Sequence, residues 1–142
     1  MALPVMELTV SRTIAAPAER VFEAWMDPKH PGAPWTGCER VLLHPEVDGL
    51  YYWAVQHEGR IWAHYGRFVE IARPRRVAYT WMSEATKGLE SVVTVTFEPR
   101  GEQTEVTLRH SGLPDEAMGR QHEAGWTGIL GRLGETLAGK RA

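Results

Sequence analysis

Aromatic and histidine side chains are the residues of this sequence whose types and spacing could do chemistry. The 142 residues include six tryptophans, four tyrosines, three phenylalanines and six histidines. Many of these rings fall on the faces of predicted strands, or on the stripe of a predicted helix, that should point inward. Such a set indicates a largely apolar small-molecule site with a few polar groups. The predicted ligand-binding residues are Trp35, Tyr51, Trp53, His64, Phe68, Tyr79, Trp81, His110 and Trp126.

Each of these rings also has a simpler interpretation, because a single buried aromatic residue is more often part of a core than of a site. Trp35 lies on a predicted connection and is either a lid over a cavity or a plug at the edge of the core. His64 and His110 are the candidates for orienting a ligand or moving a proton, because imidazole titrates near neutral pH. The residues assign no catalytic role, so the choice between a binding protein and an enzyme stays open.

Motifs for metal, phosphate or nucleophilic chemistry are absent from the sequence. Neither His57-Glu58 nor His122-Glu123 has the second histidine of an H-E-x-x-H metal site, and there is no G-x-S-x-G turn or glycine-rich phosphate loop. Cys38 is the single cysteine, and His44 lies six residues further along the same predicted strand, roughly 20 Å away. Cys38 is therefore interpreted as a small buried residue, and no metal or cofactor is expected.

Length and charge restrict the class of protein. A chain of 142 residues is expected to form one domain that buries about 68–70% of its unfolded surface. The net charge of −2, with both signs scattered, gives no electrostatic reason to expect nucleic acid or an anionic membrane as a partner. No apolar stretch reaches the roughly 18 residues of a membrane span, and no signal peptide is recognisable. With one cysteine, these features predict a cytoplasmic protein.

The elements that must position the rings begin with a strand and a short helix. Residues 6–15 alternate between apolar and polar side chains, as in a strand with one buried face. Pro17 suits the first turn of a helix, and Asp27-Pro28 ends that helix. Residues 29–37 carry two prolines and two glycines, so they are predicted to be a loop or a broken helix.

Six further strands follow, separated by turn signals such as Asp48-Gly49 and Glu58-Gly59. The predicted strands cover residues 39–45, 50–57, 60–72, 77–82, 91–98 and 104–110. Consecutive strands joined largely by hairpins indicate an antiparallel sheet, and helices before and after it indicate a two-layer α+β domain.

The last predicted helix, at about residues 115–138, is the element around which the sheet is expected to curl. Asp115 is expected to cap its first turn. Five glycines inside it each cost roughly 0.5–1 kcal/mol relative to alanine. They either let the sheet approach closely or lie on a solvent face. The apolar stripe consists of Met118, His122, Trp126, Ile129, Leu130, Leu133 and Leu137, and the glycines are Gly119, Gly125, Gly128, Gly131 and Gly134.

Several stretches resemble the family of activators of the heat-shock-protein-90 ATPase. Residues 14–25, IAAPAERVFEAW, followed by Asp27-Pro28, resemble the family's opening, and residues 93–97, VTVTF, and Gly125-Trp126 match later motifs. The resemblance spans residues 8–137. One departure is Asp48-Gly49, where family members commonly carry a glycine pair. The resemblance implies the helix-grip superfamily, which includes steroidogenic lipid-transfer domains, birch-pollen-allergen-like proteins and polyketide cyclases.

The sequence and the resemblance together predict one helix-grip domain over residues 6–138. Its expected α+β fold is a curled antiparallel sheet of about seven strands around a long C-terminal helix, with two short helices after the first strand.

The first functional expectation is a small hydrophobic or aromatic ligand held in a cavity between the sheet and the helix. One alternative is an enzyme of the cyclase or hydrolase type that uses His64 or His110 as a general base. Another is the chaperone-interacting module that the family name implies, although no surface patch is marked in the sequence. Fold alone does not decide among these functions, and the oligomeric state stays open.

Overall fold

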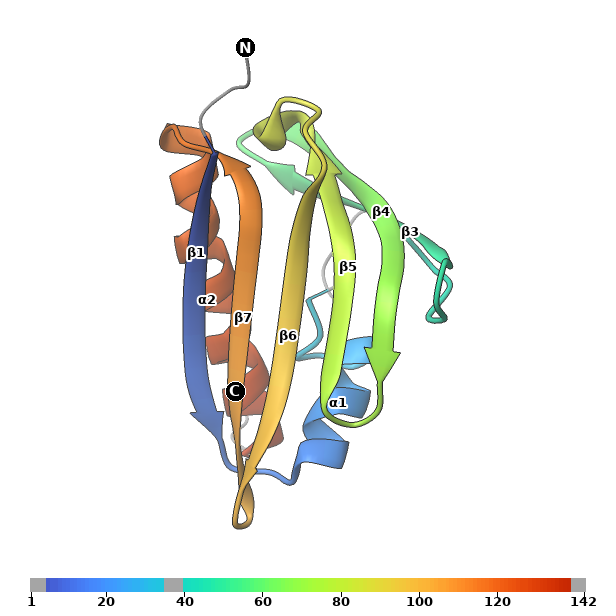
Figure 1. Ribbon diagram of the computed structural model, residues 1–142, viewed down its shortest axis with the longest axis vertical. Coiled ribbons are helices and arrows are strands. Elements are labelled where there is room, and N and C mark those ends of the chain that lie inside the picture. The colour runs from blue at the N-terminus through green and yellow to red at the C-terminus, as the bar shows by residue number, and fades with distance from the viewer. Residues whose placement is uncertain (1–4, 35–39, 139–142) are drawn as a thin grey trace.

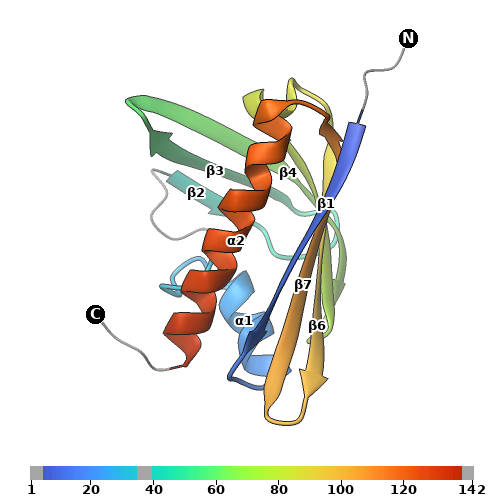
Figure 2. The ribbon, with the colours of Figure 1, turned by 90° about the vertical axis from the view of Figure 1, so that its left-hand side faces the viewer.

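A seven-stranded antiparallel sheet curls around a long C-terminal helix in the computed structural model (Figures 1 and 2). The structure describes residues 5–34 and 40–138. The sheet order is β1-β7-β6-β5-β4-β3-β2. Its strands are β1 (Val5–Ile14), β2 (Arg40–Leu43), β3 (Leu50–His57), β4 (Arg60–Ala72), β5 (Arg76–Ser83), β6 (Ser91–Arg100) and β7 (Gln103–Pro114). The helices are α1 (Ala18–Met26), the short 3-10 helix η1 (Glu84–Thr86) and α2 (Ala117–Leu137).

The predicted α+β architecture is confirmed, with two differences in detail. One helix, α1, follows β1, and residues 27–34 form turns, so the described part of the β1–β2 connection has no second helix. Its prolines explain this, because each one removes a backbone N–H that a helix would need. Strand β2 is shorter than predicted and ends two residues before Pro45. Trp35 and Cys38 lie outside the described residues.

Helix α1 closes one end of the curled sheet (Figure 2). Its apolar side buries Val21, Phe22 and Trp25 completely. The Phe22 ring meets Phe97 of β6 edge-on at 5.2 Å between ring centroids, and Trp25 meets the same ring at 6.4 Å. Edge-to-face aromatic pairs are attractive beyond their buried area. This packing forms the part of the core beside α1, and α2 also packs against it.

Helix α2 lies on the concave face of the sheet, with β1 and β7 on one side and the curled strands β3 and β4 on the other (Figure 2). The predicted stripe faces inward, and Trp126, Leu130, Leu133 and Leu137 are buried. The expected cap is wrong: the N-cap residue is Glu116, and it makes no side-chain capping hydrogen bond. The carboxylate of Asp115 accepts a hydrogen bond from Arg120 instead, at 2.9 Å.

The glycines of α2 divide between the two explanations considered for them. A Cβ at Gly119 would lie 1.9 Å from the carbonyl oxygen of Pro114, and one at Gly134 would lie 2.6 Å from Nε of Arg12. At these two positions another part of the same protein packs closely against the helix: the backbone of Pro114 at Gly119 and the side chain of Arg12 at Gly134. A Cβ at Gly125 or Gly128 would meet nothing within 4 Å, so these two lie on the open side of the helix.

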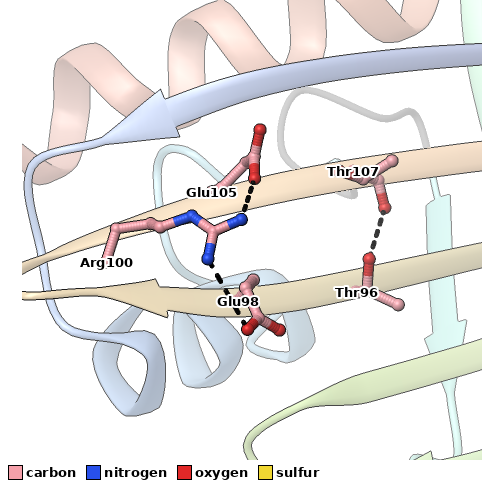
Figure 3. Close-up of polar contacts among 5 residues, drawn as sticks. All are labelled: Thr96, Glu98, Arg100, Glu105 and Thr107. Carbon is pink, nitrogen blue, oxygen red and sulfur yellow. Dashed lines mark hydrogen bonds and ion pairs between the residues drawn. The ribbon is translucent and has the colours of Figure 1, made fainter.

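The outer face of the β6–β7 hairpin is polar (Figure 3). Glu98 and Glu105 are direct cross-strand partners, a like-charge arrangement that destabilises a sheet. Arg100 contacts both carboxylates, at 3.8 Å and 2.9 Å. Because all three side chains are exposed, the ion pairs add little stability beyond cancelling this repulsion.

Replacing two helix glycines by alanine should separate the two roles. Gly119→Ala is expected to lower the free energy of unfolding by about 2 kcal/mol or more, because its Cβ would clash with backbone. Gly128→Ala, at an open position, is expected to raise it by roughly 0.5–1 kcal/mol through helix propensity. Urea denaturation of both variants measures the difference, and a similar stabilisation in both would contradict the close approach at Gly119.

Candidate functional site

A cavity of 340 Å³ lies between α2 and strands β3, β4 and β5. Its size is at the lower end of the range for small-molecule sites. The lining is mostly apolar and aromatic, with a few polar groups. The lining residues are Pro34, Trp53, His64, Trp81, Gln121, His122, Gly125, Trp126, Ile129 and Arg132.

The sheet supplies one wall from three neighbouring strands. Trp53 of β3 and His64 of β4 are cross-strand partners, and their rings stack at 4.4 Å with an interplanar angle of 17°. Trp81 of β5 lies 5.3 Å from Trp53 and 4.8 Å from His64 between ring centroids. Side chains at every second position of a strand share a face, so the alternation of β3, β4 and β5 brings the three rings together.

Helix α2 supplies the opposite wall from residues spaced three or four apart, which share one face of a helix. The Trp126 ring lies 4.9 Å from the ring of Trp81, so the two walls meet there. His122, Gly125 and Ile129 complete this side, and Arg132 stands at the end nearer the C-terminus. Gly125 has no side chain, which leaves the cavity open between its neighbours.

A chain of buried hydrogen bonds holds the Trp126 ring in place. Its Nε1–H donates to Nδ1 of His110 at 3.0 Å, so this nitrogen is the acceptor and Nε2 carries the proton. Nε2 then donates to Oγ of Ser91 at 2.8 Å, and that hydroxyl donates to the carbonyl oxygen of Trp81 at 2.7 Å. His110 is therefore a neutral connector between α2 and the sheet, with both ring nitrogens occupied.

His122 is fixed in a similar way. Its Nδ1 lies 3.0 Å from the carbonyl oxygen of Met118 and 3.2 Å from that of Gly119, which makes it the donor. Nε2 is then free to accept the hydrogen bond of Trp81 Nε1–H at 3.3 Å. The sequence places His122 on the stripe of α2 but not in the site. Its position one turn before Trp126 is the signal that could have included it.

All three histidines at the cavity are neutral at pH 7. Burial and, to a smaller extent, proximity to His122 together lower the pKa of His110 to about 2 and that of His64 to about 4. Around His64, hydrogen bonding to the backbone of Trp53 and Trp62 opposes this effect in part. Burial also lowers the pKa of His122, against the opposing effect of its two backbone acceptors. The cavity therefore carries no histidine charge.

The predicted site residues occupy three regions. Trp35 lies outside the described residues. His110 is hydrogen-bonded to Trp126 but does not line the cavity. Tyr51, Phe68 and Tyr79 form a separate aromatic cluster, with centroid distances from 5.5 Å to 5.9 Å, and do not line the cavity. Burial raises the pKa of both tyrosines in this cluster, so their hydroxyls stay protonated. The predicted residues that do line the cavity are Trp53, His64, Trp81 and Trp126.

Two further properties concern only residues 5–34 and 40–138. This part of the chain contains no group of three or more His, Cys, Asp or Glu side chains that could hold a metal ion. Within the same part, no helix combines the length and the apolar character needed to cross a membrane.

Comparison with known proteins gives a family and a set of similar folds. The profile of the family described as Activator of Hsp90 ATPase homolog 1-like protein matches residues 15–138. No curated protein sequence matches the chain.

Three solved structures illustrate the similarity of fold. Protein CV1439 from Chromobacterium violaceum has a TM-score of 0.78 and 25% identity, over 92% of this chain and 96% of that one. PFC0360w, an HSP90 activator from Plasmodium falciparum, has a TM-score of 0.75 and 22% identity, over 96% and 98%. CalU16 from Micromonospora echinospora has a TM-score of 0.73 and 21% identity, over 94% and 76%.

The buried histidines should make stability depend on pH. His64 has a folded pKa of about 4 against 6.5 when unfolded, so the unfolded state binds more protons between these values. Its contribution is complete above pH 6.5 and is lost as the pH falls toward 4. Lowering the pH from 7 to 5.5 should therefore cost roughly 1 kcal/mol for this residue.

Urea denaturation of His64→Gln at the two pH values measures this contribution. The variant should lose roughly 1 kcal/mol less stability than the wild type over that interval. His44→Gln, at an exposed position, is the matched control for the substitution itself. An unchanged dependence in His64→Gln would show that His64 is not held neutral in the folded protein.

Proposed function

The chain belongs to the Activator of Hsp90 ATPase homolog 1-like family, and we propose that it binds a small hydrophobic or aromatic molecule between the curled sheet and α2. The observation that carries the proposal is the 340 Å³ cavity with the rings of Trp53, Trp81 and Trp126 in its walls. The domain extent of residues 6–138 and a cytoplasmic location stay predictions from the sequence.

The walls of the cavity are built in advance of any ligand, which favours binding. Trp81 and Trp126 each donate a hydrogen bond to a histidine, so their orientations are set by neighbours. A ligand that meets rings already fixed loses less free energy to ordering them. Burial of apolar surface then contributes about 25 cal/mol for each Å² removed from water.

The hydrogen bonding of the histidines supports a binding protein over a cyclase or hydrolase. A general base needs an accessible lone pair. In His110 and His122 that lone pair already accepts a hydrogen bond from a tryptophan. His64 lies flat against Trp53, and its Nδ1 is buried away from the cavity space. The cavity is therefore better suited to binding an apolar molecule than to general-base catalysis.

Filling the mouth of the cavity tests the proposal without disturbing the core. Gly125 lines the cavity and a Cβ there would meet nothing within 4 Å, so Gly125→Leu should fold normally and place its side chain in the opening. Gly128→Leu is the matched control, because it lies on the same helix, is equally open and does not line the cavity.

The uncharged dye N-phenyl-1-naphthylamine serves as the probe, with its fluorescence followed during titration. Wild type and Gly128→Leu should bind it with similar affinity. Gly125→Leu should bind it at least about tenfold more weakly, because the added side chain occupies space the rings need. Failure of the wild type to bind a range of neutral aromatic molecules, or equal binding by both variants, would reject the cavity as the site.

A second candidate is contact with a chaperone, which the family name and the Plasmodium falciparum structure suggest. An outer groove of 490 Å³ on the other face of β2–β5 supports it, because the groove is lined by the exposed apolar side chains of Leu42, Leu50 and Tyr65. Leu42 is 56% exposed and Leu50 64% exposed, in contrast to the polar outer face of β6 and β7 (Figure 3). Exposed apolar patches of this kind often mark protein contacts.

Calorimetric titration with Hsp90 tests this candidate. Leu50→Glu is expected to weaken binding at least about tenfold, because a carboxylate would enter an apolar contact. Val5→Glu is the control, since Val5 is 58% exposed but lies on β1, at the opposite edge of the sheet. The candidate fails if Hsp90 does not bind the wild type, or if it binds Leu50→Glu as well as it binds the control.

A further inference from the structure

Among the described residues that line the cavity, Arg132 is the one with a formal charge. We infer, on the premise of the proposed function, that the ligand is an aromatic acid: a planar ring system whose anionic group binds the guanidinium of Arg132. The other polar lining groups are two neutral histidines and Gln121.

The hydrogen bonding of Arg132 leaves most of its donors for a ligand. One Nη2–H donates to the carbonyl oxygen of Ala33 at 2.9 Å, and a guanidinium has five N–H donors in all. Arg132 makes no ion pair with any residue in the described ranges. By contrast, Arg120 of the same helix pairs with Asp115 at 2.9 Å. An anion is the group that would use the remaining donors and charge of Arg132.

The positions of the aromatic wall and the cation define how the ligand would lie. Trp126 and Arg132 are six residues apart on α2, which places them roughly 9 Å apart along the helix axis. Ile129 lies between them in the cavity lining, and the bond to Ala33 holds the guanidinium beside the turn that precedes Pro34. A ring system against Trp53, Trp81 and Trp126 can therefore extend past Ile129 and present an acidic group to Arg132.

The charge of the whole protein does not account for a preference for anions. The net charge is −2, so an acid gains nothing from the overall field. Any preference for an acid over a neutral molecule of the same shape must come from a local cation. In the part of the lining that the structure describes, that cation is Arg132.

Two dyes that share their rings and differ by one sulfonate test this inference. They are 1-anilinonaphthalene-8-sulfonate, an anion, and the neutral N-phenyl-1-naphthylamine. The wild type should bind the anion about tenfold more tightly than the neutral dye, as expected for a charge-assisted pair. Arg132→Gln should lose that preference, so that the ratio of its affinities for the two dyes falls to about one. Arg120→Gln, on the same helix but outside the cavity lining, should behave as wild type.

The outcomes separate this inference from the function on which it rests. If the wild type binds both dyes equally, or if Arg132→Gln retains the preference, the inference about an acid is overturned. The proposal that the cavity binds a ligand is then unaffected. If Arg132→Gln weakens both dyes by the same factor, Arg132 supports the shape of the cavity and does not recognise an anion, which also overturns it. If neither dye binds the wild type, the proposed function itself fails.

Discussion

The structure depends on the buried hydrogen-bond chain that runs from Trp126 through His110 and Ser91 to the carbonyl oxygen of Trp81. These four residues belong to α2, β7, β6 and β5, so the chain joins the helix to three strands. Each donor along it has an acceptor, which is the condition under which buried polar groups can be kept without a large cost. It fixes two of the three tryptophans of the cavity wall, Trp126 through its indole N–H and Trp81 through its backbone carbonyl.

This constraint explains why the site is apolar, preformed and neutral. A proton on Nδ1 of His110 would break the bond from Trp126, and burial opposes the charge as well. His122 holds the Trp81 indole under the same restriction. The histidines therefore position the rings. Ligand contact is left to aromatic surfaces, to the opening at Gly125 and to the guanidinium of Arg132.

Much of the fold follows from the sequence, because alternation and turn residues determine which faces are buried and which strands are neighbours. The same alternation places Trp53, His64 and Trp81 on inward faces. Alternation does not show which residues of neighbouring elements lie at the same level along the sheet. Tyr51 and Tyr79 therefore share those faces yet belong to a different cluster. Pairings such as Trp81 with His122 arise only when helix and sheet meet, and no local pattern predicts them.

Ligand binding between the sheet and α2 can be tested by a proton–nitrogen correlation spectrum of the indole N–H groups during titration with N-phenyl-1-naphthylamine, with peaks assigned from Trp→Phe variants. The peaks of Trp53, Trp81 and Trp126 should shift, because these rings line the cavity. The peak of Trp62, which does not line it, should stay in place. A bound dye that moves the Trp62 peak and leaves the other three unchanged would show that the dye does not bind in the cavity.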